Sequence, residues 1–477
     1  MKPDFGACGA TLAVLALLAT LGFGWRRRRY GMLLRMDPRR DDAFRCRLAH
    51  PVTISLHSDG FELPSGLRVS GQTAFLAFDV RATLLGTFAD PFIEVSFGPI
   101  TYRQYFERGA NGRRYLNLSP IFQAVHQRPP AAAAGLAVRV CLRGKSISWT
   151  RAGTLELFDS PSIERATKLV VAPHPDDAEI AAFGIYSEQV SWVATVTAGE
   201  LGLPATSAPI SSGRDAVRWA ARIRVWDSLT IPQLGGVPTE RCVSLVYPDG
   251  RLKEMHDRSG TSASLWEGAP PRASLRSRNR LPEFQHGDSG CRWKDLVDEI
   301  RLLLEKSNPE IVVCPHPLMD PHDDHVFTTV AIEEAARDEK QKERLFFLYA
   351  VHHPHAPLYP FGPASSCVSL APSRDTEWVA DSIYSHALTP DQRTAKYFAI
   401  DAMHGLRTYF DGEPKTVHQG LRALRRELGA LLCGTGLPAS SFLRRGPRPN
   451  EIYYVVSRES LSALVKRALD RYPCDVS

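Results

Sequence analysis

The order of apolar runs after residue 166 constrains the fold more than any other feature of the sequence. Short apolar segments at residues 168–172, 190–196 and 311–314 alternate with helical patterns at residues 214–226 and 293–306. The second helical pattern has one apolar stripe, formed by Leu296, Ile300, Leu303 and Leu304. Strands that alternate with helices are typical of a mainly parallel sheet covered on both faces. We therefore expect an α/β domain over residues 164–477.

Residues 52–158 follow a different pattern. Short apolar or alternating runs, rich in β-branched and aromatic residues, are separated by turn signals such as Asp59-Gly60 and Asn111-Gly112. Such runs predict an antiparallel β-domain of the sandwich type over residues 31–163. No catalytic cluster stands out in it, so we interpret it as a packing or positioning module, with glycan binding as the alternative. Residues 159–165 are the predicted linker.

Residues 6–25 carry no charged side chain and are followed by Arg26 to Arg29. At about 1.5 Å per residue, this run can cross a hydrocarbon core of about 30 Å. Lys2 is the only basic residue before this run, and arginines stand where a signal peptide would be cleaved. Residues 1–30 therefore predict a transmembrane anchor, with a cleaved signal peptide as the alternative. The positive-inside rule then predicts a single-pass protein of the cell membrane with its catalytic domain in the cytoplasm.

Charge and cysteine usage exclude several other classes of protein. The formal net charge is +6, to which the four consecutive arginines contribute most. No nucleic-acid partner is expected, because such a binder should carry a basic stripe over a folded domain. The nine cysteines include no Cys-x-x-Cys pair, which argues against a disulfide scaffold and against a zinc finger.

Two segments between and after the predicted elements need separate interpretations. Residues 254–290 are rich in Ser, Gly, Pro and Arg, too polar for a core and too long for an ordinary connection, so we expect either disorder or a lid over a site. Leucines from Leu421 to Leu432 recur at helical spacing beside arginines, which predicts a helix docked on the core.

Polar clusters follow two of the predicted strands, where ligands bind in open α/β sheets. One is His174-Pro-Asp-Asp177, and the other is the stretch 315–325, which ends in His322-Asp-Asp-His325. A metal explains both clusters, because imidazole and carboxylate are good zinc ligands and three protein ligands leave a fourth position for water. His174, Asp177 and His325 are the predicted ligands.

The remaining polar residues of the two clusters then have separate predicted roles. Asp176 points elsewhere than Asp177 and could act as general base. His322 could protonate a leaving group or stabilise an oxyanion, with Asp323 or Asp324 orienting an imidazole. His316 and Asp320 are interpreted as loop-shaping residues. A single residue of these types often has only a structural role. Two such clusters at the ends of two strands are much less likely to arise by chance.

These motifs resemble those of the PIG-L or LmbE-like zinc-dependent de-N-acetylases, over residues 166–477 and in the same order. His174-Pro-Asp-Asp177 is similar to the family's His-Pro-Asp-Asp signature, and His322-Asp-Asp-His325 to its His-x-Asp-His element. The resemblance implies a Rossmann-like fold, Zn²⁺ held by the three predicted ligands, and Asp176 as the base. His322 and Asp324 complete the catalytic set.

The same resemblance implies a set of substrate-binding residues. Glu200 ends a Thr-x-Gly-Glu turn, Asp249 belongs to a Pro-Asp-Gly loop, Arg214 opens a helix, and His404 matches a later His element only in part. The sequence departs from the family at Ala181-Ala-Phe-Gly184, where a glycine-rich run is usual, and in the polar insertion 254–290.

The resemblance implies a hydrolase that removes the N-acetyl group from an N-acetylglucosaminyl-type glycolipid or glycan and releases acetate. A non-catalytic, membrane-tethered glycan-binding or scaffold protein on the same fold is the alternative. Gly287-Asp288-Ser289-Gly290 is similar to a serine-protease nucleophile segment, but it stands in a polar loop without a β-barrel to hold a triad.

Overall fold

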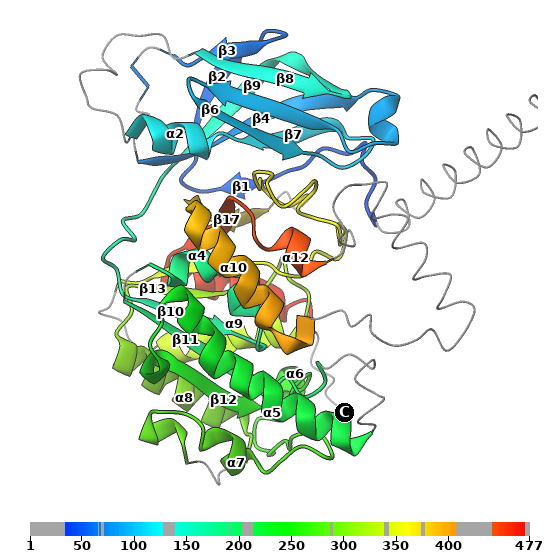
Figure 1. Ribbon diagram of the computed structural model, residues 1–477. Coiled ribbons are helices and arrows are strands. Elements are labelled where there is room, and N and C mark those ends of the chain that lie inside the picture. Colours follow the sequence, from blue (N-terminus) through cyan, green and yellow to red (C-terminus); the bar gives the residue numbers. More distant parts are fainter. Residues whose placement is uncertain are drawn as a thin grey trace, which may run out of the picture.

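The computed structural model describes residues 34–64, 66–67, 71–126, 139–188, 190–202, 213–286, 290–337, 343–373, 377–406 and 441–472. The predicted anchor, the predicted helix at 421–432 and Ser289 lie outside these residues. Within them, no helix is long and apolar enough to cross a bilayer. A strand-rich part stands above a mixed α/β part (Figure 1). The expected mixed α/β class with a strand-rich N-terminal region is thus confirmed.

One seven-stranded sheet organises the α/β part. Its order is β12 (Cys242–Tyr247), β11 (Ser191–Thr197), β10 (Lys168–Ala172), β13 (Ile311–Pro315), β14 (Leu345–Tyr349), β17 (Asn450–Val456) and β16 (Ser382–Ala387). The first five strands are parallel, whereas β17 pairs antiparallel with both neighbours. Every residue of β10 and β13 is buried, which explains their uninterrupted apolar sequences.

Alternate residues of β10 enter two different cores, one on each face of the sheet. Leu169 and Val171 belong to a cluster with residues of α8 (Trp293–Ser307), α9 (Asp323–Ala336) and α13 (Arg458–Leu469). Val170 and Ala172 belong to a cluster with α4 (Phe183–Tyr186), α5 (Arg214–Thr230) and α10 (Pro390–Ala402). Both faces are therefore covered by helices, and the strand ends remain available to build a site.

The strand-rich part is a sandwich of two antiparallel four-stranded sheets. One has the order β2 (His50–Ser55), β9 (Ile147–Asp159), β4 (Gln72–Ala82), β7 (Asn111–Asn117), and the other β3 (Gly60–Glu62), β8 (Arg139–Lys145), β5 (Phe92–Phe97), β6 (Ile100–Tyr105). Their inner faces share one apolar core. A 3-10 turn η1 (Leu85–Thr87) and helix α2 (Ser119–His126) complete this part.

The sandwich is joined to the α/β part by shared backbone and side-chain contacts. Strand β1 (Arg45–Cys46) pairs with β15 (Trp378–Ala380). Phe44, Phe75 and Tyr115 pack in the same cluster as the main sheet. The buried Asn117 side chain donates to the Val368 carbonyl at 2.8 Å and the Ser385 hydroxyl at 3.0 Å. Apolar packing and buried hydrogen bonds thus fix the contact between the two parts.

Several short elements complete the α/β part. They are α3 (Asp177–Ala181), η4 (Ile231–Gly235), η5 (Thr239–Arg241), α6 (Leu252–Asp257), α7 (Arg272–Arg276), η6 (Pro282–Phe284), η7 (His404–Leu406) and α12 (Phe442–Arg445). Three of them fall in or beside the polar segment 254–290. There Phe284 is fully buried, and the buried Arg276 guanidinium pairs with Glu299 at 2.7 Å. At Arg276 and Phe284 this segment is therefore packed on the α/β part.

Candidate metal centre

Four neighbouring parallel strands end at one edge of the sheet and supply the polar residues of the site. His174 follows β10, and His325 lies in the first turn of α9, which follows β13. Glu200 follows β11 and Asp249 follows β12. The strand order thus brings together residues that are up to about 150 positions apart in the sequence, as expected at the carboxyl edge of a parallel sheet.

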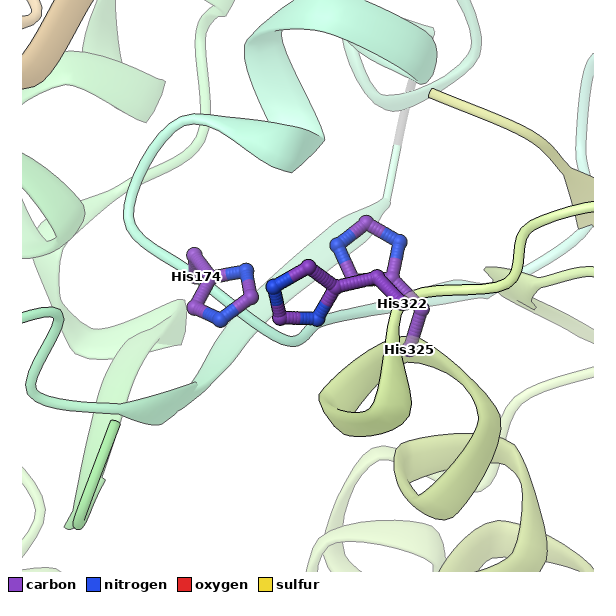
Figure 2. Close-up of side chains that lie close together, drawn as sticks. All are labelled: His174, His322 and His325. Atoms are coloured by element: carbon purple, nitrogen blue, oxygen red, sulfur yellow. The ribbon is translucent and has the colours of Figure 1, made fainter. Parts of the chain in front are cut away.

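Three imidazole rings gather at this edge (Figure 2). The ring centroids of His174 and His322 are 4.8 Å apart, those of His322 and His325 are 5.0 Å apart, and those of His174 and His325 are 5.3 Å apart. One nitrogen from each ring lies within 4.8 Å of the others. His174 and His325 are buried and His322 is half-buried, so the rings form a compact cluster with limited access to water.

The carboxylate of Asp177 lies between two of these rings. Its Oδ2 is 3.2 Å from His174 Nδ1 and 3.2 Å from His325 Nε2. In a tetrahedral zinc site with bonds of about 2.0–2.1 Å, neighbouring ligand atoms lie about 3.3 Å apart. Both distances from Asp177 match this spacing. Moreover, His325 Nε2 is buried and makes no hydrogen bond of acceptable geometry. The groups of described residues whose ligand atoms all lie within 4.8 Å of one another are His174–His322–His325, Asp177–His325–His352 and His174–Asp249–Asp324. The three predicted ligands therefore belong to one larger cluster of possible metal ligands.

Asp320 supports His325 from the other side of the ring. Its fully buried Oδ2 lies 2.9 Å from His325 Nδ1 and accepts the backbone N–H groups of Val351 and His352 at 2.9 and 3.0 Å. A carboxylate behind a ligating imidazole orients the ring and raises its basicity. Asp320 does shape the loop, as the sequence suggests, but it also contacts a predicted ligand.

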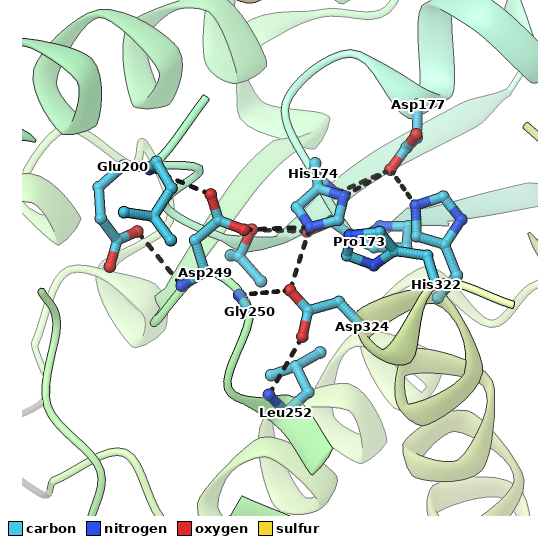
Figure 3. Close-up of polar contacts among 12 residues, drawn as sticks. Pro173, His174, Asp177, Glu200, Asp249, Gly250, Leu252, His322 and Asp324 are labelled. Atoms are coloured by element: carbon cyan, nitrogen blue, oxygen red, sulfur yellow. Dashed lines mark hydrogen bonds and ion pairs between the residues drawn. The ribbon is translucent and has the colours of Figure 1, made fainter. Parts of the chain in front are cut away.

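Asp324 holds His174 and a neighbouring loop together (Figure 3). Its fully buried carboxylate is 3.0 Å from His174 Nε2 and accepts the backbone N–H groups of Gly250 at 2.7 Å and Leu252 at 3.1 Å. It therefore orients His174, leaving Nδ1 toward Asp177. It makes no such contact with His322, whose Nδ1 is buried without a hydrogen-bond partner.

The cluster stabilises positive charge. Burial opposes protonation of His174 and His325, but the carboxylates of Asp177, Asp249, Asp320 and Asp324 outweigh it and raise the pKa of both imidazoles, that of His325 to about 10. Burial together with the neighbouring His174 and His325 rings lowers the pKa of His322 instead. A surplus of carboxylates around two imidazoles is the electrostatic environment that a divalent cation requires.

Asp176 forms an ion pair with Arg224. Burial raises the pKa of Asp176 to about 6, against the opposing charge of Arg224, whose Nη2 lies 3.3 Å from Asp176 Oδ2. The Arg224 side chain is confined by close approaches to Gly199, Gly202 and Gly405, where a Cβ would collide with it. Asp176 is thus a buried carboxyl beside one confined cation.

Arg224 was not among the predicted site residues, whereas Arg214 was. The structure places Arg214 at the exposed start of α5, in an ion pair with the exposed Glu267. Arg224 lies on the buried face of α5 with Ala220, Ala221 and Val225. An arginine on the apolar stripe of that helix was the sequence signal that could have identified it.

The other predicted substrate residues lie around the cluster. Asp249 Oδ1 is 3.2 Å from His174 Nε2, and its Oδ2 accepts the Leu201 N–H. Glu200 accepts the Asp249 N–H (Figure 3). It also accepts the Trp266 N–H, so the polar segment 254–290 contacts this edge through Trp266. His404 Nδ1 instead pairs with Asp227 at 2.8 Å. Their roles toward a substrate stay predictions.

His352 is a further site residue that the sequence did not reveal. Its ring lies 4.9 Å from that of His325 and 5.4 Å from that of His322, and one of its nitrogens is within 4.8 Å of ligand atoms of Asp177 and His325. It follows β14, which pairs with β13. To predict from the sequence that His352 lies near the cluster, one would have had to recognise Leu345–Tyr349 as a strand of this sheet.

One family model matches the part of the chain that holds the cluster. Residues 169–336 match the family model PIG-L, described as GlcNAc-PI de-N-acetylase. This range includes the three predicted ligands, Asp176, His322 and Asp324. A search of curated proteins gave no match.

Several solved structures are similar at low identity. They include an N,N'-diacetylchitobiose deacetylase from Pyrococcus horikoshii (16% identity, 62% of this chain and 86% of that chain covered, TM-score 0.32) and a zinc-inhibited teicoplanin deacetylase (16%, 61% and 98%, 0.30). A 4-carboxy-2-hydroxymuconate hydratase from Pseudomonas putida is similar to the same extent (16%, 61% and 95%, 0.28). Because these TM-scores are low, the assignment rests on the family model and on the residues. Residues 169–336 are thus similar to the PIG-L family.

Proposed function

We propose that this protein is a zinc-dependent N-deacetylase that removes the acetyl group from an N-acetylglucosaminyl-type glycolipid or glycan. The observation that carries the proposal is a buried carboxyl, Asp176, directly beside a set of donors that fits a metal, namely His174, Asp177 and His325. A site that only bound a metal or a glycan would need no buried second carboxylate at this position.

Zn²⁺ held by His174, Asp177 and His325 would supply Lewis acidity toward the amide carbonyl and the attacking water. Asp176 accepts the proton of that water, and Arg224 keeps Asp176 ionised and in place. The half-buried His322 donates a hydrogen bond to the oxyanion, and His322 or Asp176 delivers a proton to the departing amine. Asp324 fixes the orientation of His174. The products are acetate and a free amino sugar.

Four residues are proposed to contact the substrate. Glu200 and Asp249 border the histidine cluster, Arg214 is the first residue of α5, and His404 pairs with Asp227 in the last part of the same helix. We also propose that residues 1–30 anchor the chain in the cell membrane with the catalytic domain in the cytoplasm. The uncharged run at residues 6–25, followed by four arginines, supports this proposal.

The alternative is a membrane-tethered glycan-binding or scaffold protein without turnover. Two variants separate it from the enzyme. Asp176→Asn should retain zinc but lose acetate release from N-acetylglucosaminyl compounds, because general base catalysis typically contributes 10²–10⁴-fold. His174→Ala should lose both the metal and the activity. If wild-type protein carries zinc but releases no acetate, the binding alternative holds, and if Asp176→Asn keeps the full rate, Asp176 is not the base.

A further inference from the structure

The outward face of α5 carries two exposed tryptophans, Trp219 and Trp226, and Arg222, none of which has a role in the proposed hydrolysis. Trp219, Arg222, Ile223 and Trp226 recur on this face at helical spacing, and with Ser274, Leu275, Arg278 and His404 they line an open groove of about 380 Å³. Trp219 is 49% exposed and Trp226 is 58% exposed. Large aromatic side chains dominate the energetics of interfaces, so two exposed indoles on one helix face indicate a contact surface.

The charges in this groove are positive. The Arg222 guanidinium lies 5.4 Å from the centroid of the Trp219 ring, and Arg278 donates to the Arg222 carbonyl at 2.9 Å. Among the described residues that line the groove, none carries a carboxylate. The surface therefore combines indole rings with arginines and would attract an anionic partner.

Indoles interleaved with arginines are typical of protein surfaces at the membrane–water interface, where the ring enters the headgroup region and the cation meets anionic lipid. We propose that this groove docks on the anionic headgroup surface of a bilayer. The same chain carries the uncharged run at residues 6–25, which is long enough to reach such a bilayer.

Docking through this face would place the candidate metal centre close to the lipid. Arg224 projects from the opposite face of α5 to Asp176, and the η7 turn that supplies His404 to the groove also packs on Arg224 through Gly405. The groove and Asp176 are therefore separated by roughly one helix diameter, about 10 Å. Docking itself does not depend on the proposed hydrolysis, so the two can fail separately.

Lipid-dependent quenching of indole fluorescence tests the proposal on the full-length protein. The protein is reconstituted in vesicles of phosphatidylcholine and phosphatidylglycerol in which brominated phosphatidylcholine acts as the quencher. Trp25, at the end of the uncharged run, is also expected to be quenched by lipid. Of the quenching that remains after the contribution of Trp25 is subtracted, the double variant Trp219→Phe/Trp226→Phe should lose most. Arg222→Glu and Arg278→Glu should each lower the docked fraction, since one cation near an anionic surface changes binding by roughly fivefold.

Matched controls lie on β9 of the sandwich, where the Trp149 indole donates to the His57 carbonyl. Trp149→Phe and Arg151→Glu should leave the lipid-dependent quenching unchanged. Equal quenching in wild type and Trp219→Phe/Trp226→Phe would overturn the proposal, as would quenching that is the same without phosphatidylglycerol. Self-association that Trp226→Glu abolishes would assign the groove to a second copy of the chain and would also overturn it.

Discussion

Asp320→Asn should weaken metal binding without unfolding the protein. One oxygen of Asp320 lies 2.9 Å from His325 Nδ1 in an ion pair and accepts the N–H groups of Val351 and His352 at 2.9 and 3.0 Å. The carbonyl oxygen of an asparagine can occupy this position and retain all three contacts. The other oxygen accepts only the His322 N–H, at 3.3 Å, so the substitution loses one long hydrogen bond and the negative charge behind His325.

The size of the effect follows from that lost charge. Removing the carboxylate partner of a ligating histidine typically lowers metal affinity 10- to 100-fold, which equals about 1.4–2.7 kcal/mol. Competition with a chromophoric zinc chelator measures the affinity, and thermal unfolding of the metal-free protein measures the fold. Asp323→Asn is the matched control, because this exposed carboxylate accepts a hydrogen bond from the Tyr472 hydroxyl and pairs with no other side chain within the described part of the chain. Unchanged affinity in Asp320→Asn, or an equal loss in Asp323→Asn, would refute the reasoning.

Three other variants test separate contacts. Burial raises the pKa of Asp176 to about 6, and the Arg224 cation opposes this rise. Arg224→Met removes that cation, so the acidic limb of the pH profile of kcat/KM should move to higher pH. If the limb does not move, Asp176 is not the titrating base. Lys396→Met leaves the Glu451 carboxylate, 2.6 Å away, buried without its cation, and should cost about 3–5 kcal/mol in denaturant unfolding, much of which Lys396→Met/Glu451→Gln should restore. Asn117→Ala removes two buried hydrogen bonds between the sandwich and the α/β part, which should cost about 1–3 kcal/mol without changing zinc affinity.

The parts of the site that follow directly from strand ends were predictable from the sequence. The run at residues 168–172 and the run at 311–314 are uninterrupted and apolar, as buried parallel strands require, and the structure pairs them side by side. Their adjacency brings His174 and His325 to the same edge. The type of strand and the polar residues at its end were therefore enough to predict that His174 and His325 lie close together.

Residues supplied by less regular segments could not be predicted in the same way. Asp320 and His352 meet because β14 pairs with β13, and pairing order in a sheet depends on tertiary packing rather than on local pattern. Arg224 could have been placed only from the helical phase of α5, whose buried face carries this charge opposite the carboxylate of Asp176. In the polar segment 254–290, Arg276 is buried because Glu299 pairs with it, a partner that composition does not reveal.

Acetate release during zinc titration of the metal-stripped, full-length protein tests the central claim most directly. With N-acetylglucosaminyl compounds as substrates, activity should be absent in the stripped protein and should rise until a single zinc is bound per chain. His325→Ala should show no such rise, because it lacks the ligand that α9 supplies. Undiminished acetate release from stripped protein, or no release at any zinc concentration, would contradict the assignment of His174, Asp177 and His325 as the centre of a metal-dependent hydrolase.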